Sequence, residues 1–244
     1  MGKYTFYLGM STPALLAAGE ALKTRGYPVV ERPCPAVTHL LLPIPMAKNT
    51  QLRPILEQLP TNVTVVGGYL PELPGYRTVD LLYNDAYLAE NAAITAHCAI
   101  AEALPRMTVT LQECPVLIIG WGRIGKCLAP LLKALGAKVT VAARKDVARA
   151  MVQALGYKAT ILENAPLENY RLIFNTVPAP VLSEEQMGYC QPGCLKIDLA
   201  SVLGMAGEDV VWARGLPGKN TPESSGKLIA RTVIRLLPEK EDAT

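Results

Sequence analysis

The feature that most constrains this chain is a glycine-rich turn between an apolar run and a helical pattern. The apolar run Pro115–Ile119 comes directly before the turn, and the helical pattern follows over residues 123–135. The turn holds glycines at three spaced positions, Gly120, Gly122 and Gly125. In this order they permit a tight turn, a close approach of backbone to pyrophosphate, and close packing of helix on strand. Because amides at the helix N-terminus then face an anion, the pattern predicts a dinucleotide-binding βαβ unit of Rossmann type.

The next strand end indicates which dinucleotide is bound. It reads Ala143, Arg144 and Lys145, with no acidic residue before Asp146. A site for NAD places an acid there for the ribose hydroxyls, whereas cations at that point suit the 2′-phosphate of NADP. Arg149, on the following predicted helix, is expected to add to the same charge. An exposed basic turn without a ligand is the alternative, and the glycines upstream favour NADP(H).

Short apolar runs alternate with helical patterns along the whole chain, as in α/β proteins with buried parallel sheets. The 244 residues suffice for two small domains, and 50% of them are hydrophobic while 18% are charged. We therefore expect an α/β fold with two parallel-sheet domains. The predicted parts are an N-terminal βαβ domain at 1–84, which ends after a loop at Leu70–Tyr76, a connecting helix at 85–105, the Rossmann domain at 106–218 and a C-terminal helix at 219–244.

Two further strand ends are expected beside the cofactor, because ligands of open α/β sheets lie outside the carboxyl ends of the strands. Asn175 and Thr176 are candidates to bond ribose or nicotinamide groups, and Ala200 and Ser201 to border the reacting ring. For each residue alone, a role in forming the turn is an equally good explanation. The complete predicted cofactor set is Gly120, Trp121, Gly122, Arg123, Ile124, Gly125, Ala143, Arg144, Lys145, Asn175, Thr176, Val177, Pro178, Asp198, Ala200 and Ser201.

Candidates for proton transfer are few, because the chain has only two histidines. His39 begins an apolar run and is interpreted as structural. His97 lies on the predicted connecting helix, near the face that carries Asn91 and Thr95, so we expect it to act as general acid or base. Asn91 and Thr95 are predicted to contact the substrate. A hydrogen-bonded helix histidine without a catalytic role is the alternative.

A glycine-rich segment precedes the last predicted helix. We expect a tight loop at Gly215–Gly218 and an N-terminal cap at Thr221 for a helix that starts at Pro222. A helix N-terminus beside a lysine favours anions, so a carboxylate substrate is predicted here. The assigned residues are Lys219 and Ser224 as catalytic groups, and Asn220, Thr221 and Ser225 as substrate-binding groups. A capped helix without a ligand is the competing interpretation.

The bulk composition argues against several other classes of protein. A net charge of +3 is too small to favour nucleic acid or an anionic membrane as partner. The six cysteines are scattered and form no metal-binding pattern, so we expect reduced thiols and no metal site. No apolar run approaches the ~20 residues of a membrane span. We therefore expect a cytoplasmic protein.

Several segments together resemble the family formed by the A subunit of dipicolinate synthase from spore-forming bacteria. They occur in the same order over most of residues 85–237, and the most specific pair is Asp198–Ser201 with Gly215–Gly218. The matching segments are Asn91–Ile100, Leu117–Lys145, Asn175–Leu182, Ile197–Ser201 and Gly215–Gly226.

The resemblance implies a flavodoxin-like N-terminal domain, a Rossmann domain, and a last helix that returns to the first domain. It implies NADP-linked oxidation of a dihydrodipicolinate-type precursor to pyridine-2,6-dicarboxylate. It also implies a partner in the form of a second, flavoprotein-like subunit, and we expect self-association as well.

Departures from the family bear on the substrate more than on the cofactor. After Ser201 the family tends to carry an Arg-Pro-Gly-Gly-like run, whereas this chain reads Val202-Leu203-Gly204. Two alternatives therefore stand beside dipicolinate synthesis. One is an NADP-linked dehydrogenase of another small hydroxy or imino carboxylic acid. The other is a nucleotide-binding regulatory subunit without catalysis of its own.

Overall fold

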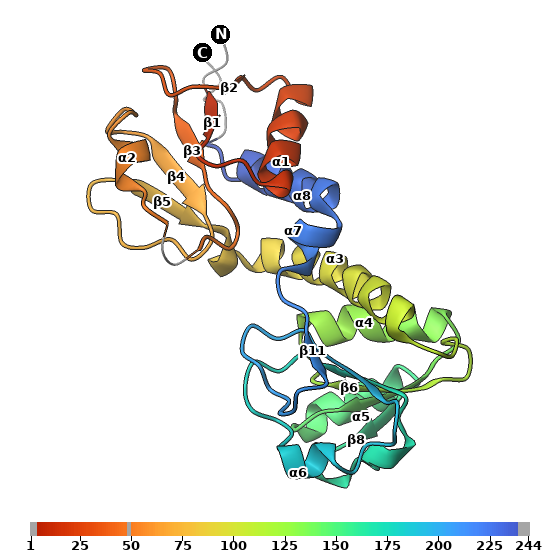
Figure 1. Ribbon diagram of the computed structural model, residues 1–244. Helices are drawn as coiled ribbons and strands as arrows, with labels where there is room; N and C mark the ends of the chain where they lie inside the picture. Colours follow the sequence, from red (N-terminus) through yellow and green to blue (C-terminus); the bar gives the residue numbers. More distant parts are fainter. Residues whose placement is uncertain (1–3, 48–49, 239–244) are drawn as a thin grey trace. The chain divides into compact units, whose positions relative to one another are not determined.

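The structure, a computed structural model, describes residues 4–47 and 50–238, so the last six residues of the predicted 219–244 segment lie outside it. The chain divides into two compact units. The first unit comprises Met1–Asn91 and Pro217–Thr244, and the second comprises Ala92–Leu216. Figure 1 shows the helices and strands of each unit.

The first unit is built on a five-stranded parallel sheet with the strand order β2-β1-β3-β4-β5. This order is that of flavodoxin-like doubly wound folds. The central strand β3 is fully buried, whereas β5 lies at the edge and is half exposed. The strands are β1 (Phe6–Leu8), β2 (Val29–Val30), β3 (His39–Leu41), β4 (Thr64–Gly67) and β5 (Arg77–Asp80).

Two helices of the first unit, distant in sequence, pack closely on each other. Helix α1 (Pro13–Thr24) follows β1, and α8 (Pro222–Arg235) is the last helix of the chain. Gly226 permits their close approach, because a Cβ there would lie 2.6 Å from the Ala14 carbonyl oxygen and the Ala17 Cβ. Arg231 and Arg235 of α8 both pair with Glu90. The C-terminal helix is thus a structural part of the first unit.

The second unit contains a six-stranded parallel sheet with the order β11-β10-β9-β6-β7-β8. Renumbered from its own first strand, this is the 3-2-1-4-5-6 order of the Rossmann fold. Its middle strands are buried on both faces, which explains their continuous apolar runs. The strands are β6 (Pro115–Ile119), β7 (Lys138–Ala142), β8 (Lys158–Thr160), β9 (Leu172–Asn175), β10 (Leu195–Asp198) and β11 (Val210–Trp212).

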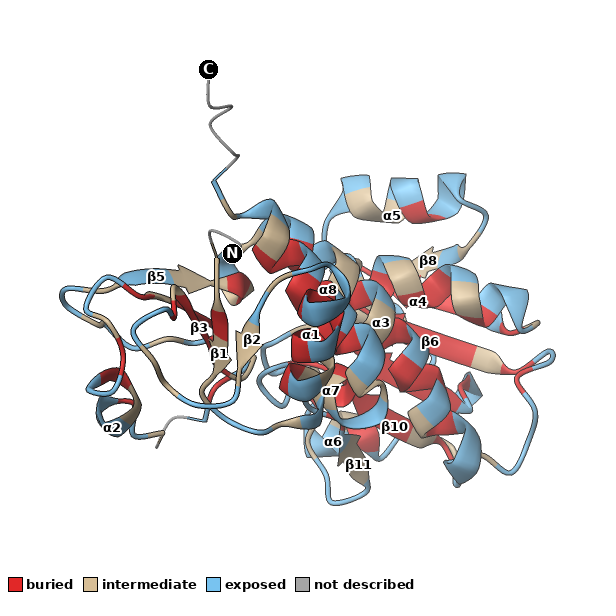
Figure 2. Cartoon of the chain, turned by 90° about the horizontal axis from the view of Figure 1, so that it is seen from above, coloured by how far each residue is buried: buried red, intermediate tan, exposed pale blue. Residues whose placement is uncertain are grey.

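Successive side chains of β6 enter two separate cores. Val116 and Ile118 pack with α3 (Asp85–Ala103) and α4 (Arg123–Ala134) on one face. On the other face, Leu117 and Ile119 pack among residues that include Met187 of the short α6 (Glu184–Met187). Figure 2 shows the buried β6 and, at the edge of the unit, the largely exposed α5 (Asp146–Ala154).

The remaining helices are short. They are α2 (Arg53–Leu56) and α7 (Leu216–Asn220), and the 3-10 helices η1 (Leu81–Tyr83), η2 (Leu104–Arg106), η3 (Leu162–Asn164) and η4 (Leu167–Asn169). Helix α7 corrects the predicted loop over Gly215–Gly218. Its carbonyls are used by helical backbone bonds, with the Thr221 amide donating to the Pro217 oxygen at 3.1 Å.

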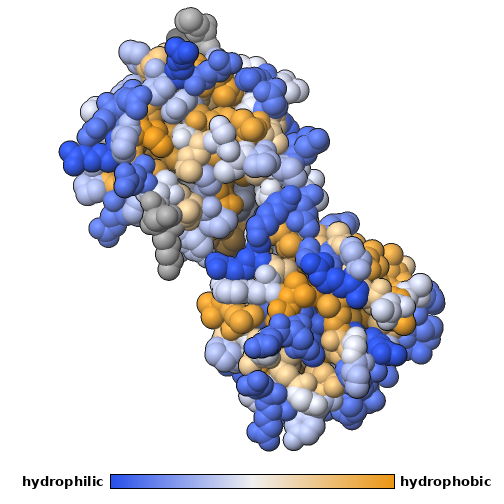
Figure 3. Space-filling view, in the orientation of Figure 1, coloured by the Kyte–Doolittle hydropathy of each residue, from blue (hydrophilic) through white to orange (hydrophobic). Residues whose placement is uncertain are grey.

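The structure confirms the predicted fold class, two α/β parts with parallel sheets. None of the described helices is long and apolar enough to cross a membrane. All six cysteines are free thiols. Hydrophobic residues also reach the surface of the second unit on the face drawn in Figure 3.

Candidate functional site

The candidate site lies in the second unit, where the carboxyl ends of neighbouring strands meet at one edge of the sheet. The order in which the chain adds strands to this parallel sheet reverses at β6, because β7 pairs on one side of it and β9 on the other. Such a switch point is where open α/β sheets bind ligands. The edge carries, in spatial order, the turns after β7, β6, β9, β10 and β11.

Two of the three glycines after β6 are required by the protein itself. Gly120 has φ +103°, and a Cβ there would lie 2.5 Å from Thr176 Oγ1. At Gly125 a Cβ would lie 2.3 Å from the Gly120 carbonyl oxygen. These two positions therefore fix the tight turn and the contact of α4 with β6, as their motif positions predict.

Gly122 differs from its two neighbours. Among the described residues, no atom lies within 4 Å of the position that its Cβ would take. Its φ of −85° is open to any residue, so neither packing nor backbone strain demands glycine there. Gly122 is also the N-cap of α4, and no described side chain caps this helix end. A helix N-terminus without a side-chain cap, beside open space, fits a pyrophosphate group.

The turn after β7 presents two cations. Arg144 and Lys145 are exposed, and no described carboxylate pairs with either, whereas Ala143 is buried. Arg149 was predicted to add charge to this site, but its guanidinium is already engaged. Its Nη1 donates to the carbonyl oxygens of Ala143 and Arg144 at 2.7 Å each, and its Nη2 pairs with Asp146. Arg149 thus holds the turn that displays the two exposed cations.

The turns after β9 and β10 are joined by a buried polar network. The Asp198 carboxylate accepts hydrogen bonds from Asn175 Nδ2 at 2.9 Å and from the amides of Ala200, Gly204 and Met205 at 2.8–3.1 Å. Asn175 and Asp198 are both 0% exposed. Their polar atoms are occupied inside the protein, so their geometry suits holding the two turns in place.

The other predicted residues of these turns lie at the edge of the sheet. Thr176 donates its hydroxyl to the Ile119 carbonyl oxygen at 2.9 Å, which ties the β9 turn to β6. Val177 is half-buried beside it, and Pro178 is exposed. Ala200 is buried and Ser201 is exposed. The structure therefore brings Gly120, Thr176 and Val177 together, with Ser201 two strands away on the turn after β10.

The Trp121 indole turns toward the α4 face of the sheet. Its ring lies 6.2 Å from that of Tyr157, and Ile124 packs against the same core. Its Nε1 is buried and finds no hydrogen-bond partner among the residues that the structure describes. Arg123, at the first position of α4, is exposed.

The predicted catalytic and substrate residues differ in exposure. On α3, His97 is exposed, Thr95 is 8% exposed and Asn91 is half-buried. Thr95 and His97 therefore point to different sides of the helix. Asn91 belongs to the first unit and the other two to the second.

Around α7 and α8, in the first unit, Lys219, Asn220 and Ser224 are exposed while Ser225 is buried. Thr221 stands at the N-cap position of α8, as predicted, but its hydroxyl donates to the Pro217 carbonyl oxygen at 3.2 Å and makes no cap bond. Thr221 thus occupies the predicted N-cap position without a side-chain cap bond.

Two residues at the β11 end were not anticipated. Trp212 is 44% exposed, and its Nε1 donates to the Ala200 carbonyl oxygen at 3.0 Å. The Arg214 guanidinium carbon lies 4.8 Å from the centre of the Trp212 ring. The sequence signal for this pair is an aromatic residue and a cation two positions apart, directly before the glycine-rich segment that starts at Gly215.

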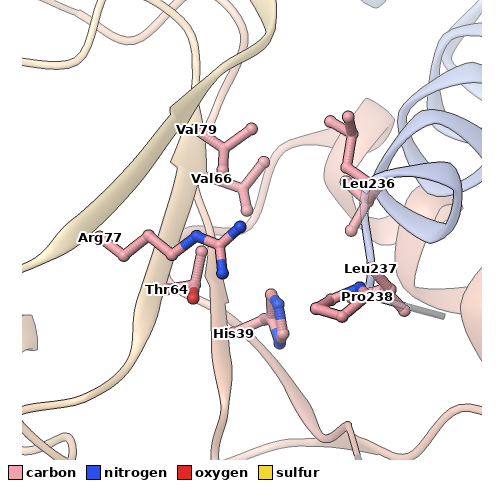
Figure 4. Close-up of a pocket in the computed structure, with 9 residues that line it drawn as sticks. His39, Thr64, Val66, Arg77, Val79, Leu236, Leu237 and Pro238 are labelled. Atoms are coloured by element: carbon pink, nitrogen blue, oxygen red, sulfur yellow. The ribbon is translucent and has the colours of Figure 1, made fainter. Parts of the chain in front are cut away.

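A separate small pocket occurs in the first unit. His39, Thr64 and Arg77 line it from strands β3, β4 and β5, and Leu236–Pro238, which follow α8, lie across from them (Figure 4). Burial, with a contribution from Arg77, lowers the pKa of His39 to about 4. The His39 ring packs against the rings of Tyr4 and Phe6 and shares a hydrogen bond with the Thr38 hydroxyl, in keeping with its structural interpretation.

Comparison with known families supports a dehydrogenase-type domain. Residues 85–189 match the family model of the D-isomer specific 2-hydroxyacid dehydrogenase, NAD binding domain. The match includes the glycine turn, the basic turn after β7 and the end of β9. It supports a nicotinamide dinucleotide as the cofactor of this chain.

Comparison with individual proteins gives a second result. The chain is 26% identical to the A subunit of dipicolinate synthase from Bacillus subtilis over 201 residues, which are 75% of this chain and 68% of the relative. The crystal structure of the same subunit from Bacillus halodurans has a TM-score of 0.84 at 23% identity, covering 97% of this chain and 98% of that one. The Bacillus subtilis structure has a TM-score of 0.80 at 19% identity, covering 97% and 96%. In sequence and in fold this chain is thus similar to the A subunit of dipicolinate synthase, and the similarities support an oxidoreductase of dehydrogenase type.

Proposed function

We propose that this chain is an NADP(H)-dependent oxidoreductase that converts a dihydrodipicolinate-type precursor into pyridine-2,6-dicarboxylate. The observation that carries the cofactor is the combination of open space at Gly122 with the exposed, unpaired cations Arg144 and Lys145 among the described residues. The relatives' name supplies the substrate class.

Aromatising a dihydropyridine ring removes one hydride and one proton from it. When bound, NADP⁺ supplies the hydride acceptor. The chain's own residues have three tasks. The α4 N-terminus holds the pyrophosphate, the β7 turn binds the 2′-phosphate, and the β10 turn with Ser201 borders the reacting ring. A base must accept the proton.

We assign that base to His97. It is exposed on α3, whereas the other histidine, His39, is buried with a lowered pKa of about 4. Replacing His97 with Gln tests its role: kcat should fall about 100-fold or more, with NADPH affinity kept.

A second subunit is part of the proposal, because the relatives are named as one component of a synthase. We propose a flavoprotein-like partner, in line with the resemblance noted from sequence. The hydrophobic residues at the surface of the second unit offer area for a partner or for a second copy of the chain (Figure 3).

The test is turnover. The purified chain, with and without the second subunit, receives NADP⁺ and freshly prepared dihydrodipicolinate, and both NADPH absorbance and pyridine-2,6-dicarboxylate are followed. We expect equal amounts of the two products, formed faster when the second subunit is present. Binding of NADP⁺ with no turnover under either condition would instead identify a regulatory subunit. Turnover only with another hydroxy or imino acid would replace the substrate.

A further inference from the structure

An exposed arginine stands on an aromatic platform at the end of β11. Trp212 pairs in register with Asp198 of β10, and its Nε1 donates to the Ala200 carbonyl oxygen at 3.0 Å. The ring is thereby fixed to the turn after β10. Arg214 places its guanidinium carbon 4.8 Å from the centre of this ring.

Stacking leaves the hydrogen-bonding capacity of Arg214 free. A guanidinium that lies over an aromatic ring keeps its five N–H donors available at its edges, so it can still bind a carboxylate through two parallel bonds. Among the described residues, no carboxylate lies within ion-pair distance of Arg214. Arg149 of the same unit, by contrast, is bonded to backbone carbonyls and to Asp146. Arg214 is therefore a cation that is positioned by the Trp212 ring and has no carboxylate partner among the described residues.

Its place on the sheet indicates which anion it meets. The cations that we assign to the 2′-phosphate follow β7, and β11 lies four strands away across β6, β9 and β10. Four strand spacings amount to about 19 Å, too far for Arg214 to share that phosphate. A dinucleotide that runs from the β7 turn across the switch point points its nicotinamide end toward β10 and β11.

We propose that Arg214 binds a carboxylate of the substrate at the nicotinamide end of the site, and that Trp212 is the positioning residue that orients it. This rests on the proposed function, because it takes the dinucleotide to lie across the same edge. A planar dicarboxylate suits the arrangement, since the guanidinium fork matches a carboxylate in geometry and charge. A neutral amide of the same shape lacks the negative charge and therefore does not suit the arrangement.

Calorimetry on the full chain saturated with NADPH tests the proposal. The probes are pyridine-2,6-dicarboxylate and its neutral counterpart, pyridine-2,6-dicarboxamide. The unaltered chain should prefer the dicarboxylate. Arg214→Gln should weaken dicarboxylate binding roughly 10- to 100-fold and abolish the preference over the diamide. Arg214→Lys should recover only part of the loss, because it keeps the charge but not the fork.

Trp212→Phe keeps a ring but loses the hydrogen bond to Ala200, so we expect a smaller loss of dicarboxylate affinity, about 3- to 10-fold.

Arg171→Gln is the matched control, because Arg171 is an exposed arginine that immediately precedes β9, at the amino ends of the strands of the same sheet. It should bind both probes as the unaltered chain does. All variants should still bind NADPH, because the turn after β7 that we assign to the 2′-phosphate lies four strands away from Arg214.

Three results would overturn the assignment of Arg214. They are unchanged dicarboxylate binding in Arg214→Gln, an equal loss in Arg171→Gln, and no dicarboxylate binding to the unaltered, NADPH-loaded chain. Failure of the unaltered chain to bind NADPH would be a different result, because it would refute the proposed function itself.

Discussion

Each of the two sheets has one strand whose carboxyl end carries glycines, but these glycines have different surroundings. In the first unit a Cβ on Gly67 would lie 2.7 Å from Leu70 Cδ2, and one on Gly68 would lie 2.8 Å from Ile44 Cγ2. In the second unit Gly122 faces space with no described atom within 4 Å. The glycines of the first unit make room for the protein's own side chains, whereas Gly122 leaves room for a ligand.

A second difference concerns the helix that follows the first strand of each unit, α1 after β1 and α4 after β6. At α1 the Thr12 hydroxyl accepts a hydrogen bond from the Leu15 amide at 3.3 Å, so the helix caps itself. At α4 no described side chain takes that role. A glycine-rich strand end therefore indicates a ligand site only when open space, a helix N-terminus without a side-chain cap and suitable charge occur with it.

The largest expected effect separates Gly122 from Gly67. Gly122→Val should lower NADPH affinity by about 3–5 kcal/mol, because the side chain fills the space where amide bonds to a phosphate would form. The melting temperature of the Gly122→Val variant should stay unchanged. Gly67→Val should do the reverse, costing about 1–3 kcal/mol of folding free energy through overpacking while folded protein keeps its NADPH affinity. Calorimetric titration and thermal unfolding measure both. Equal NADPH affinity in Gly122→Val and the unaltered chain would break the comparison.

The next effect concerns the turn after β7. Replacing Arg144 and Lys145 together with Ala should cost about 2–4 kcal/mol of NADPH affinity, because two charge-assisted contacts are lost with partial redundancy. NADH affinity should change little, since that cofactor has no 2′-phosphate. Replacing Lys23 and Lys227 of the first unit with Ala, two exposed cations paired within their own helices, is the control and should change neither affinity. Equal losses of NADPH affinity and NADH affinity would show that this turn does not recognise the 2′-phosphate.

The third effect belongs to the first unit and depends on pH. Burial and Arg77 lower the pKa of His39 from 6.5 to about 4, so the unfolded chain binds a proton at a higher pH than the folded chain. The free energy of unfolding should therefore fall by about 3 kcal/mol as the pH drops from 6.5 to 4. Urea unfolding in that range measures it. His39→Gln should flatten this dependence and His97→Gln should not; a slope that survives in His39→Gln would assign it to other groups.

Much of the fold was predictable because most strands carry a clear apolar signal. Strand β6 has the bounds of the predicted apolar run, Pro115–Ile119, since a run buried on both faces is bordered by clear turns. Strand β5 was missed because an edge strand of Arg77, Thr78, Val79 and Asp80 has little apolar signal. Helix α6 was missed although Ser183 and Gln186 form a capping box that the sequence displays.

The site was only partly predictable for a related reason. Residue identities suggested the glycine turn and the basic turn, but not which side chains are already engaged. Arg149 reads as one more cation, yet it is bonded to the turn beside it. Asn175 and Asp198 read as ligand-binding groups, yet they bond to each other inside the protein. Such partners depend on tertiary contacts that no local pattern contains.

The most direct test of the account is the affinity of the unaltered chain for the two reduced cofactors, NADPH and NADH, measured by calorimetry under identical salt and pH. The exposed cations Arg144 and Lys145 predict that NADPH binds at least about tenfold more tightly, which corresponds to ~1.4 kcal/mol. Equal affinity for the two, or binding of neither, would contradict the account.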